Sequence, residues 1–182
     1  TVRYVSKTGS STPPYTSWGS AADSIQKCIN ICVNGDTVYV ANGVYKENLV
    51  INTAISLIGS SMDSTVIDGR NLEAYYTIEI RNITSLSNFN IIGLDINNVN
   101  STAIISFFND FLVSNCRVSN TPLGVFAGYT SAHVKKCIFF NVYMAFRSPC
   151  FPDTCNVLVD SCIIFTHYQN PGIAITYGSP TI

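Results

Sequence analysis

Apolar residues in this chain occur in short alternating runs, separated by turns rich in Asn, Gly, Ser and Thr. Alternation places successive side chains on opposite faces of an extended backbone, so each run predicts a short strand. Between Val38 and Ile67 the runs are interrupted at Asn42-Gly43 and at Gly59, residue types that favour tight turns. The pattern therefore predicts many short strands joined by tight turns.

One segment, residues 20–32, follows a different period. Its apolar positions recur at steps of three and four residues, which places Ile25, Cys28, Ile29 and Cys32 on one face of a helix. No other segment shows this spacing convincingly. The sequence therefore predicts a single helix near the N-terminus, preceded by a short strand at residues 2–5.

The second half of the chain repeats itself. Four positions align at spacings of 27, 21 and 25 residues: Phe89, Cys116, Cys137 and Cys162. An apolar residue lies three positions before and two positions after each of them. Such a period, with strands and no helix, is typical of a β-solenoid whose coils stack their inward side chains. In the last three repeats we expect the aligned residue and its two apolar neighbours to be buried: Val113, Cys116, Val118, Val134, Cys137, Phe139, Val159, Cys162 and Ile164.

Each coil is predicted to hold three strands, as in residues 111–113, 116–118 and 124–127. About six coils fit between Gly35 and Ile182, at one coil per repeat. We predict an all-β right-handed parallel β-helix that forms a single domain over residues 1–182, with a strand, loop and helical cap in 1–35 and coils in 36–182. No polar terminal coil precedes Ile182, so we expect the chain to continue beyond this sequence and the uncapped coil to offer a surface for self-association.

Composition agrees with a mainly β protein, since 21 Ile against 8 Leu favours strands over helices. The net charge of −1 and the 12% of charged residues leave no basic surface for a phosphate backbone, so we expect no nucleic-acid partner. The apolar runs stop short of the roughly 18 residues that cross a bilayer, so we expect no membrane span. The start at Thr1, and not at Met, indicates a processed or an excised segment, and is compatible with an export signal that has been removed.

The first seventy residues carry a resemblance to a known group. The segments ADSIQKCI (residues 22–29), GDTVYVANGVYKEN (35–48), IG (58–59) and TVIDG (65–69) resemble the opening of right-handed parallel β-helix proteins of the pectin lyase-like superfamily. The resemblance implies that the N-terminal helix plugs the open end of the β-helix, where it blocks pairing between exposed strand edges.

The opening is also similar to that of pectin methylesterases. Those enzymes carry a Gln and two Asp on successive coils, together with a downstream Arg. Gly128-Tyr129-Thr130-Ser131 is the segment nearest to that pattern, and it contains neither Gln nor Asp. The resemblance therefore implies the fold more firmly than the reaction.

The seven cysteines fall into three groups. Cys116, Cys137 and Cys162 occupy the aligned inward positions, where thiols act as small buried hydrophobes, so we give them a structural role. Cys28 and Cys32 lie one helical turn apart on the apolar face. Cys150 and Cys155 flank a loop, and they form either a local disulfide or two thiols depending on the compartment.

Charged residues give one weak catalytic candidate. A polysaccharide lyase neutralises a uronate with a cation and abstracts the neighbouring proton with a basic side chain. Arg147 is the base available on the predicted first-strand face, and Asp110 and Asp153 are the carboxylates that could hold Ca²⁺. The simpler interpretation makes Arg147 a solvated surface residue and Asp153 a turn residue, with no cofactor and no metal site.

Aromatic residues give a second functional indication. Phe126 points outward if Val125 and Ala127 point inward, and Tyr129 and Tyr177 lie beside the same series of strands. Exposed rings along a solenoid stack on sugar faces, although stacking between coils explains such rings equally well. We predict a substrate-binding row of Phe126, Tyr129, Arg147 and Tyr177.

These observations favour an extracellular or cell-surface β-helix protein that interacts with carbohydrate. The resemblance extends this to the N-terminal portion of a lyase-like enzyme acting on acidic polysaccharide. The alternative is a non-catalytic structural or adhesin-type module. The sparse charged residues favour binding over catalysis.

Overall fold

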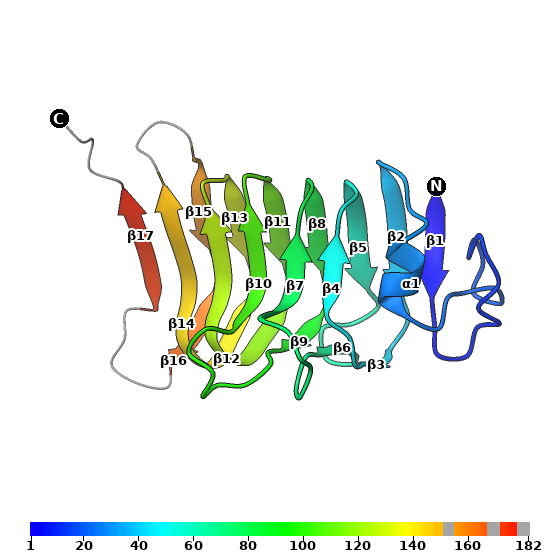
Figure 1. Ribbon diagram of the computed structural model, residues 1–182, viewed down its shortest axis with the longest axis horizontal. Coiled ribbons are helices and arrows are strands. Elements are labelled where there is room, and N and C mark those ends of the chain that lie inside the picture. Colours follow the sequence, from blue (N-terminus) through cyan, green and yellow to red (C-terminus); the bar gives the residue numbers. More distant parts are fainter. Residues whose placement is uncertain (151–154, 167–171, 178–182) are drawn as a thin grey trace.

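A computed structural model describes residues 1–150, 155–166 and 172–177. The described chain winds into an elongated stack of parallel coils, with the N-terminus at one end and β17 (Ile173–Tyr177) at the other (Figure 1). From β2 (Asp36–Val40) onward the described strands form about five turns of the solenoid, against the six or so coils that the sequence predicted.

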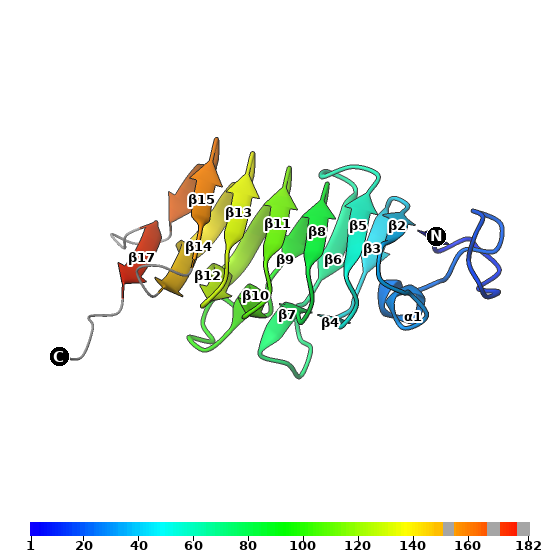
Figure 2. The ribbon, with the colours of Figure 1, turned by 90° about the horizontal axis from the view of Figure 1, so that it is seen from above.

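The back face is a parallel sheet of seven strands, one from each coil plus β1 (Val2–Val5) at its N-terminal edge. Figure 2 shows these strands side by side along the length of the molecule. After β1 and β2 the sheet continues through β5 (Ile55–Gly59), β8 (Thr84–Ser87), β11 (Phe111–Ser114), β13 (Ala132–Lys135) and β15 (Val157–Asp160).

The lower and front faces are both parts of a second parallel sheet. The lower face contains β3 (Gly43–Tyr45), β6 (Thr65–Asp68), β9 (Asn90–Ile92) and β16 (Ile163–Thr166), and the front face contains β4 (Leu49–Ile51), β7 (Tyr76–Ile80), β10 (Thr102–Phe107) and β17. Two long strands bend from one face to the other: β12 (Arg117–Gly128) and β14 (Ile138–Cys150).

The core is built from columns of inward side chains in register. On the back face one column runs through Val38, Leu57, Leu86, Val113, Val134 and Val159. The first five of these side chains are fully buried, as are Cys116 and Cys137 in the neighbouring column. The predicted β-helix and its repeat are therefore confirmed.

The last coil differs from the prediction of full burial. Val159, Cys162 and Ile164 pack against the core but are only half-buried. No further coil of the described chain covers them, so their outer sides meet solvent.

Sharp corners occur at the positions directly before the aligned column. Asn88, Asn115, Lys136 and Ser161 all adopt the left-handed backbone conformation, with φ between 50° and 63°. Asn tolerates this conformation because its side chain bonds locally, whereas Lys has no such advantage. Lys136 therefore shows that the coil geometry, rather than the local residue type, imposes the corner.

The N-terminal helix α1 spans only Ile25–Ile29, shorter than the predicted 20–32, and buries Ile25, Cys28 and Ile29. It lies beside the exposed edge of β4 on the front side (Figure 2). Gln26 donates to the Val50 carbonyl at 3.1 Å and accepts from the Val50 amide at 2.8 Å, as a neighbouring strand would. Glu47 in turn accepts from the amides of Ile25 and Gln26, both at 2.9 Å. The helix thus covers the edge of β4 with hydrogen bonds in both directions.

Candidate functional site

Two predicted site residues, Phe126 and Arg147, are neighbours on the front face. The strand register places one outward residue of each coil in a single row: Val50, Glu79, Ile105, Phe126, Arg147 and Ala174. Val125 and Ala127 are fully buried, so Phe126 points outward as the alternation predicts. The Arg147 guanidinium is exposed and forms no salt bridge with any described residue.

Tyr177 does not continue this row. The residue of β17 in register with Arg147 is Ala174, and the backbone of Tyr177 pairs with Cys150, three positions further along. The sequence alignment missed this offset because it matched strands by apolar pattern, which does not fix the register of a chain after a long loop. The side chain of Tyr177 lies outside the described residues.

Four aromatic side chains gather where the front face turns toward the back face. Phe107 contacts Phe126 with ring centroids 5.3 Å apart, and Phe108 stacks on Tyr129 at 5.6 Å with an angle of 12° between the rings. Phe107 and Phe108 join the two pairs at 6.4 Å. We call these four residues the aromatic cluster.

The aromatic cluster is exposed and its backbone is strained. Phe108 is 74% exposed and Tyr129 40% exposed, so neither ring is part of the core. Both residues have positive φ, 60° and 53°, a conformation that is uncommon for bulky residues and costs conformational energy. Two successive coils therefore hold stacked rings in solvent at a sharp corner, an arrangement for which core packing gives no reason.

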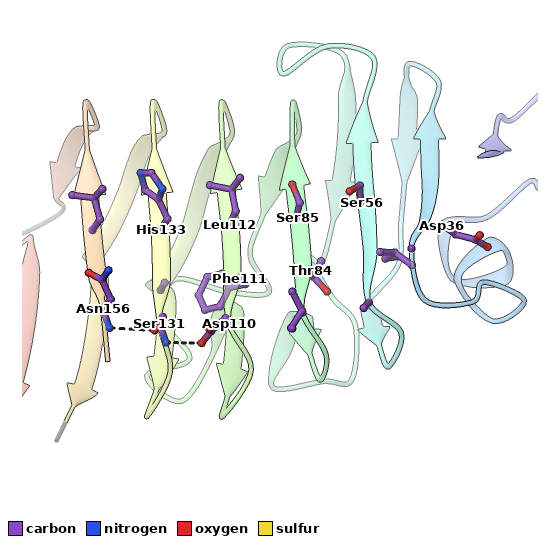
Figure 3. A pocket seen from close by; sticks show the side chains of 16 residues that line it. Asp36, Ser56, Thr84, Ser85, Asp110, Phe111, Leu112, Ser131, His133 and Asn156 are labelled. Atoms are coloured by element: carbon purple, nitrogen blue, oxygen red, sulfur yellow. Dashed lines mark hydrogen bonds between the residues drawn. The ribbon is translucent and has the colours of Figure 1, made fainter. Parts of the chain in front are cut away.

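A groove of about 700 Å³ runs across the back face, over the starts of its strands (Figure 3). Five neighbouring strands, from β5 to β15, each contribute one outward side chain in register: Ser56, Ser85, Leu112, His133 and Leu158. Asp110, Ser131 and Asn156 form its rim at the corner that carries the aromatic cluster. The groove is on a different face from Arg147.

Asp110 belongs to this groove and not to the row of Arg147. One of its carboxylate oxygens accepts from the Ser131 amide at 2.9 Å and from the Thr130 hydroxyl at 3.1 Å. The Ser131 hydroxyl accepts in turn from the Asn156 amide at 3.2 Å. The sequence interpretation associated Asp110 with the face of Arg147, whereas in the structure Asp110 lies after β10 and directly before β11, at the edge of the back face. Its observed role is to connect neighbouring turns.

His133 is a groove residue whose significance the sequence did not reveal. Alternation places it outward on its strand, as observed, and it has no catalytic partner at a recognisable spacing. In the structure it is half-buried, and its Nε2 atom is buried without a hydrogen-bond partner among the described residues. Only the packing of the neighbouring coils around the ring reveals this.

Asp36 lies at the N-terminal end of the groove and is buried. Burial alone would raise the pKa of its carboxyl, but hydrogen bonds from the Thr1 amino group, the Val33 amide and Arg3 outweigh that effect and lower the pKa to about 2. Asp36 is therefore a structural carboxylate held by its partners.

The structure bears to different degrees on the predicted Ca²⁺ site, the predicted disulfide and the predicted core thiols. Within the described ranges no three His, Cys, Asp or Glu side chains form a group that could hold a metal ion, and Asp153 lies outside these ranges. Binding of Ca²⁺ stays a prediction.

The proposed Cys150–Cys155 disulfide depends on a side chain outside the described residues. Hydrogen bonding with the Cys116 thiol, together with burial, raises the pKa of Cys137 to about 12, which fits an inert core thiol.

Comparison with known proteins identifies the architecture. No family model matches the chain. No curated protein matches it either. Among solved structures, the pectin methylesterase of Erwinia chrysanthemi superimposes with a TM-score of 0.69 at 16% identity, over 92% of this chain and 56% of that enzyme. The fold is the right-handed parallel β-helix that this enzyme also has.

Two further pectin methylesterases have the same architecture. The Aspergillus niger enzyme matches with a TM-score of 0.58 at 15% identity, over 93% of this chain and 68% of the enzyme. The carrot enzyme matches with a TM-score of 0.51 at 10% identity, over 97% and 88%. The chain spans just over half the length of the Erwinia enzyme, and at these identities the similarity establishes the fold alone. No described helix has the length and apolar character to cross a bilayer.

Proposed function

We propose that this protein binds acidic polysaccharide outside the cell, on the front face at Phe126 and Arg147. The observation that carries the proposal is the register that places Phe126 directly beside Arg147, next to the aromatic cluster. A sugar ring buries its apolar face against an aromatic ring, while a guanidinium pairs with a carboxylate through two parallel hydrogen bonds. Together these groups match a uronic acid unit.

Two further observations support this choice of ligand. Arg147 is exposed and is not neutralised by a described carboxylate, so its charge is available to a ligand. The three structural neighbours act on pectin, an acidic polysaccharide, and share this architecture with the chain. Extracellular location follows from the same ligand, since such polysaccharides are found outside cells.

Binding is favoured over catalysis. Ester or glycoside hydrolysis in such a site needs a pair of carboxylates or an activated nucleophile. In the front-face row of described residues, Glu79 is the one carboxylate, and both its oxygens bond Arg81, at 2.8 and 2.9 Å. A lyase reaction in which Arg147 abstracts a proton is the second candidate, because it needs one base and a cation that neutralises the uronate, and no pair of carboxylates.

The test is calorimetric titration with oligogalacturonates. Arg147→Ala removes a charge-assisted contact and should weaken binding by about 1 to 3 kcal/mol, and Phe126→Ala should weaken it by a similar amount. Arg117→Ala is the matched control, since Arg117 lies on the lower face in a salt bridge with Asp63. If Arg147 is also a lyase base, the parent protein will release unsaturated product and Arg147→Ala will lose turnover far more than affinity.

A parent protein that binds no oligogalacturonate would contradict the proposal. The non-catalytic structural or adhesin-type module would then be the better interpretation. Equal loss of affinity in Arg147→Ala and Arg117→Ala would also contradict it, because a general loss of positive charge would explain that result.

A further inference from the structure

The groove across the back face is a second candidate binding site, separate from the front-face row. At about 700 Å³ it falls within the size range of ligand sites in proteins. It extends over strands from β2 to β15, so it is a channel along the solenoid axis and not a local pit. A ligand that fills it is therefore elongated.

The lining repeats from coil to coil. Five neighbouring strands of the back face, from β5 to β15, each contribute one outward residue at the same register, and neighbouring strands are about 4.8 Å apart. The units of an extended β-linked glycan repeat at a comparable spacing, so one sugar can face each coil. An elongated ligand with a regular repeat thus fits better than a compact one.

The chemistry of the lining is mixed and suits sugars. In register the outward residues of the groove are Ser56, Ser85, Leu112, His133 and Leu158, and Ser131 lies on its rim, so the lining offers both hydroxyl groups and apolar side chains. Sugar rings present apolar faces and hydroxyl edges, and they need both kinds of contact.

The charged residues that line the groove indicate which class of glycan fits it. No Lys or Arg is found among the described residues that line the groove, whereas Asp36 and Asp110 both are. A uronic acid chain would bring carboxylates toward Asp110 without a cation to pair with them, which is unfavourable. We infer that the back-face groove binds an extended neutral glycan, one sugar to a coil, at a site separate from the acidic-polysaccharide site of the front face.

Blocking the groove tests the inference. Ser85 and Ser87 lie on the same strand, two positions apart, both outward and both half-buried, but Ser85 lines the groove and Ser87 does not. Ser85→Trp should weaken binding of cellohexaose or xylohexaose by roughly tenfold or more, because the bulky ring occupies the channel. Ser87→Trp should bind as the parent does. Ser56→Trp repeats the test on another coil if Ser85→Trp does not fold, as judged by circular dichroism.

The back-face site can be tested separately from the proposed front-face site. Arg147→Ala should leave binding of neutral hexaoses unchanged, and a neutral hexaose should not displace an oligogalacturonate from the parent protein. If no neutral hexaose binds, or if Ser85→Trp and Ser56→Trp both fold and bind as the parent does, the inference is wrong. Displacement of one ligand by the other would also overturn it, since it would show a single shared site.

Discussion

Asp36 shows how one residue can secure the first coil. Its carboxylate bonds the Thr1 amino group at 2.7 Å and Arg3 at 2.8 Å, and all of the side chain is buried. Removing one partner of such a buried pair leaves the other charge without compensation. Asp36→Asn should therefore lower the free energy of unfolding at neutral pH by about 3 kcal/mol, measured by urea denaturation. Asp63→Asn is the control, since Asp63 is 72% exposed and should change stability by well under about 1 kcal/mol.

The pH dependence of this contribution has a definite sign. Folding lowers the pKa of Asp36 from 3.8 to about 2, so the folded state binds the proton less readily than the unfolded state. The resulting stabilisation is present above pH 3.8 and is lost as the pH falls toward 2. Asp36→Asn should lack this part of the acid destabilisation. A variant that loses stability in acid as steeply as the parent would show that other groups account for it.

Thiol reactivity separates two environments among the cysteines. A hydrogen bond from the Cys28 thiol lowers the pKa of Cys32, which is half-buried, whereas Cys137 is fully buried with its pKa raised to about 12. The thiolate is the reactive form, so iodoacetamide should modify Cys32 well before Cys137 in the native protein. Peptide mapping by mass spectrometry reads this out. Early labelling of Cys137 would contradict the alignment of the coils.

At the scale of elements, the α1 cap gives a direct test. Ile29 is 3% exposed against the first coil, and Ile31, just beyond the helix, is 37% exposed. Ile29→Asp places a charge in the core and should cost several kcal/mol, expose the edge of β4 and lead to aggregation, as measured by light scattering. Ile31→Asp introduces the same charge in solvent and should remain monomeric. If both variants melt like the parent, the helix is not a plug.

The sequence predicted these elements to different degrees. Apolar alternation and the aligned column at Cys116 and Cys137 were sufficient for the coils, because inward positions recur at every turn. The helix was predicted too long, since its periodic residue Cys32 lies beyond the last helical turn. The groove could not be predicted, because its lining comes from strands far apart in sequence and depends on which side chains leave space between them.

At the scale of the whole molecule, the front face and the back face carry different chemical groups. The front face carries the aromatic cluster and the exposed guanidinium of Arg147, which forms no salt bridge with a described residue, and the back face carries a groove with carboxylates and no described cation. Only a few residues separate the two faces at each coil, so the corner at Phe108 and Asp110 belongs to both. On the two proposals made above, one parallel β-helix presents two ligand surfaces whose residues alternate along the chain.

A stack of coils should also lose stability unevenly along its length, because each coil contacts only its neighbours. Val134 and Val159 occupy the same inward column on adjacent coils, but Val134 is fully buried and Val159 is half-buried. Val134→Ala should destabilise this chain by about 2 kcal/mol, and Val159→Ala by less than half of that. Hydrogen exchange should accordingly be faster in β15 and β16 than in β8 and β11, since the last described coil can open without disturbing the middle ones. Uniform exchange protection along the back sheet, with equal costs for the two substitutions, would instead show that the whole stack unfolds as one cooperative unit.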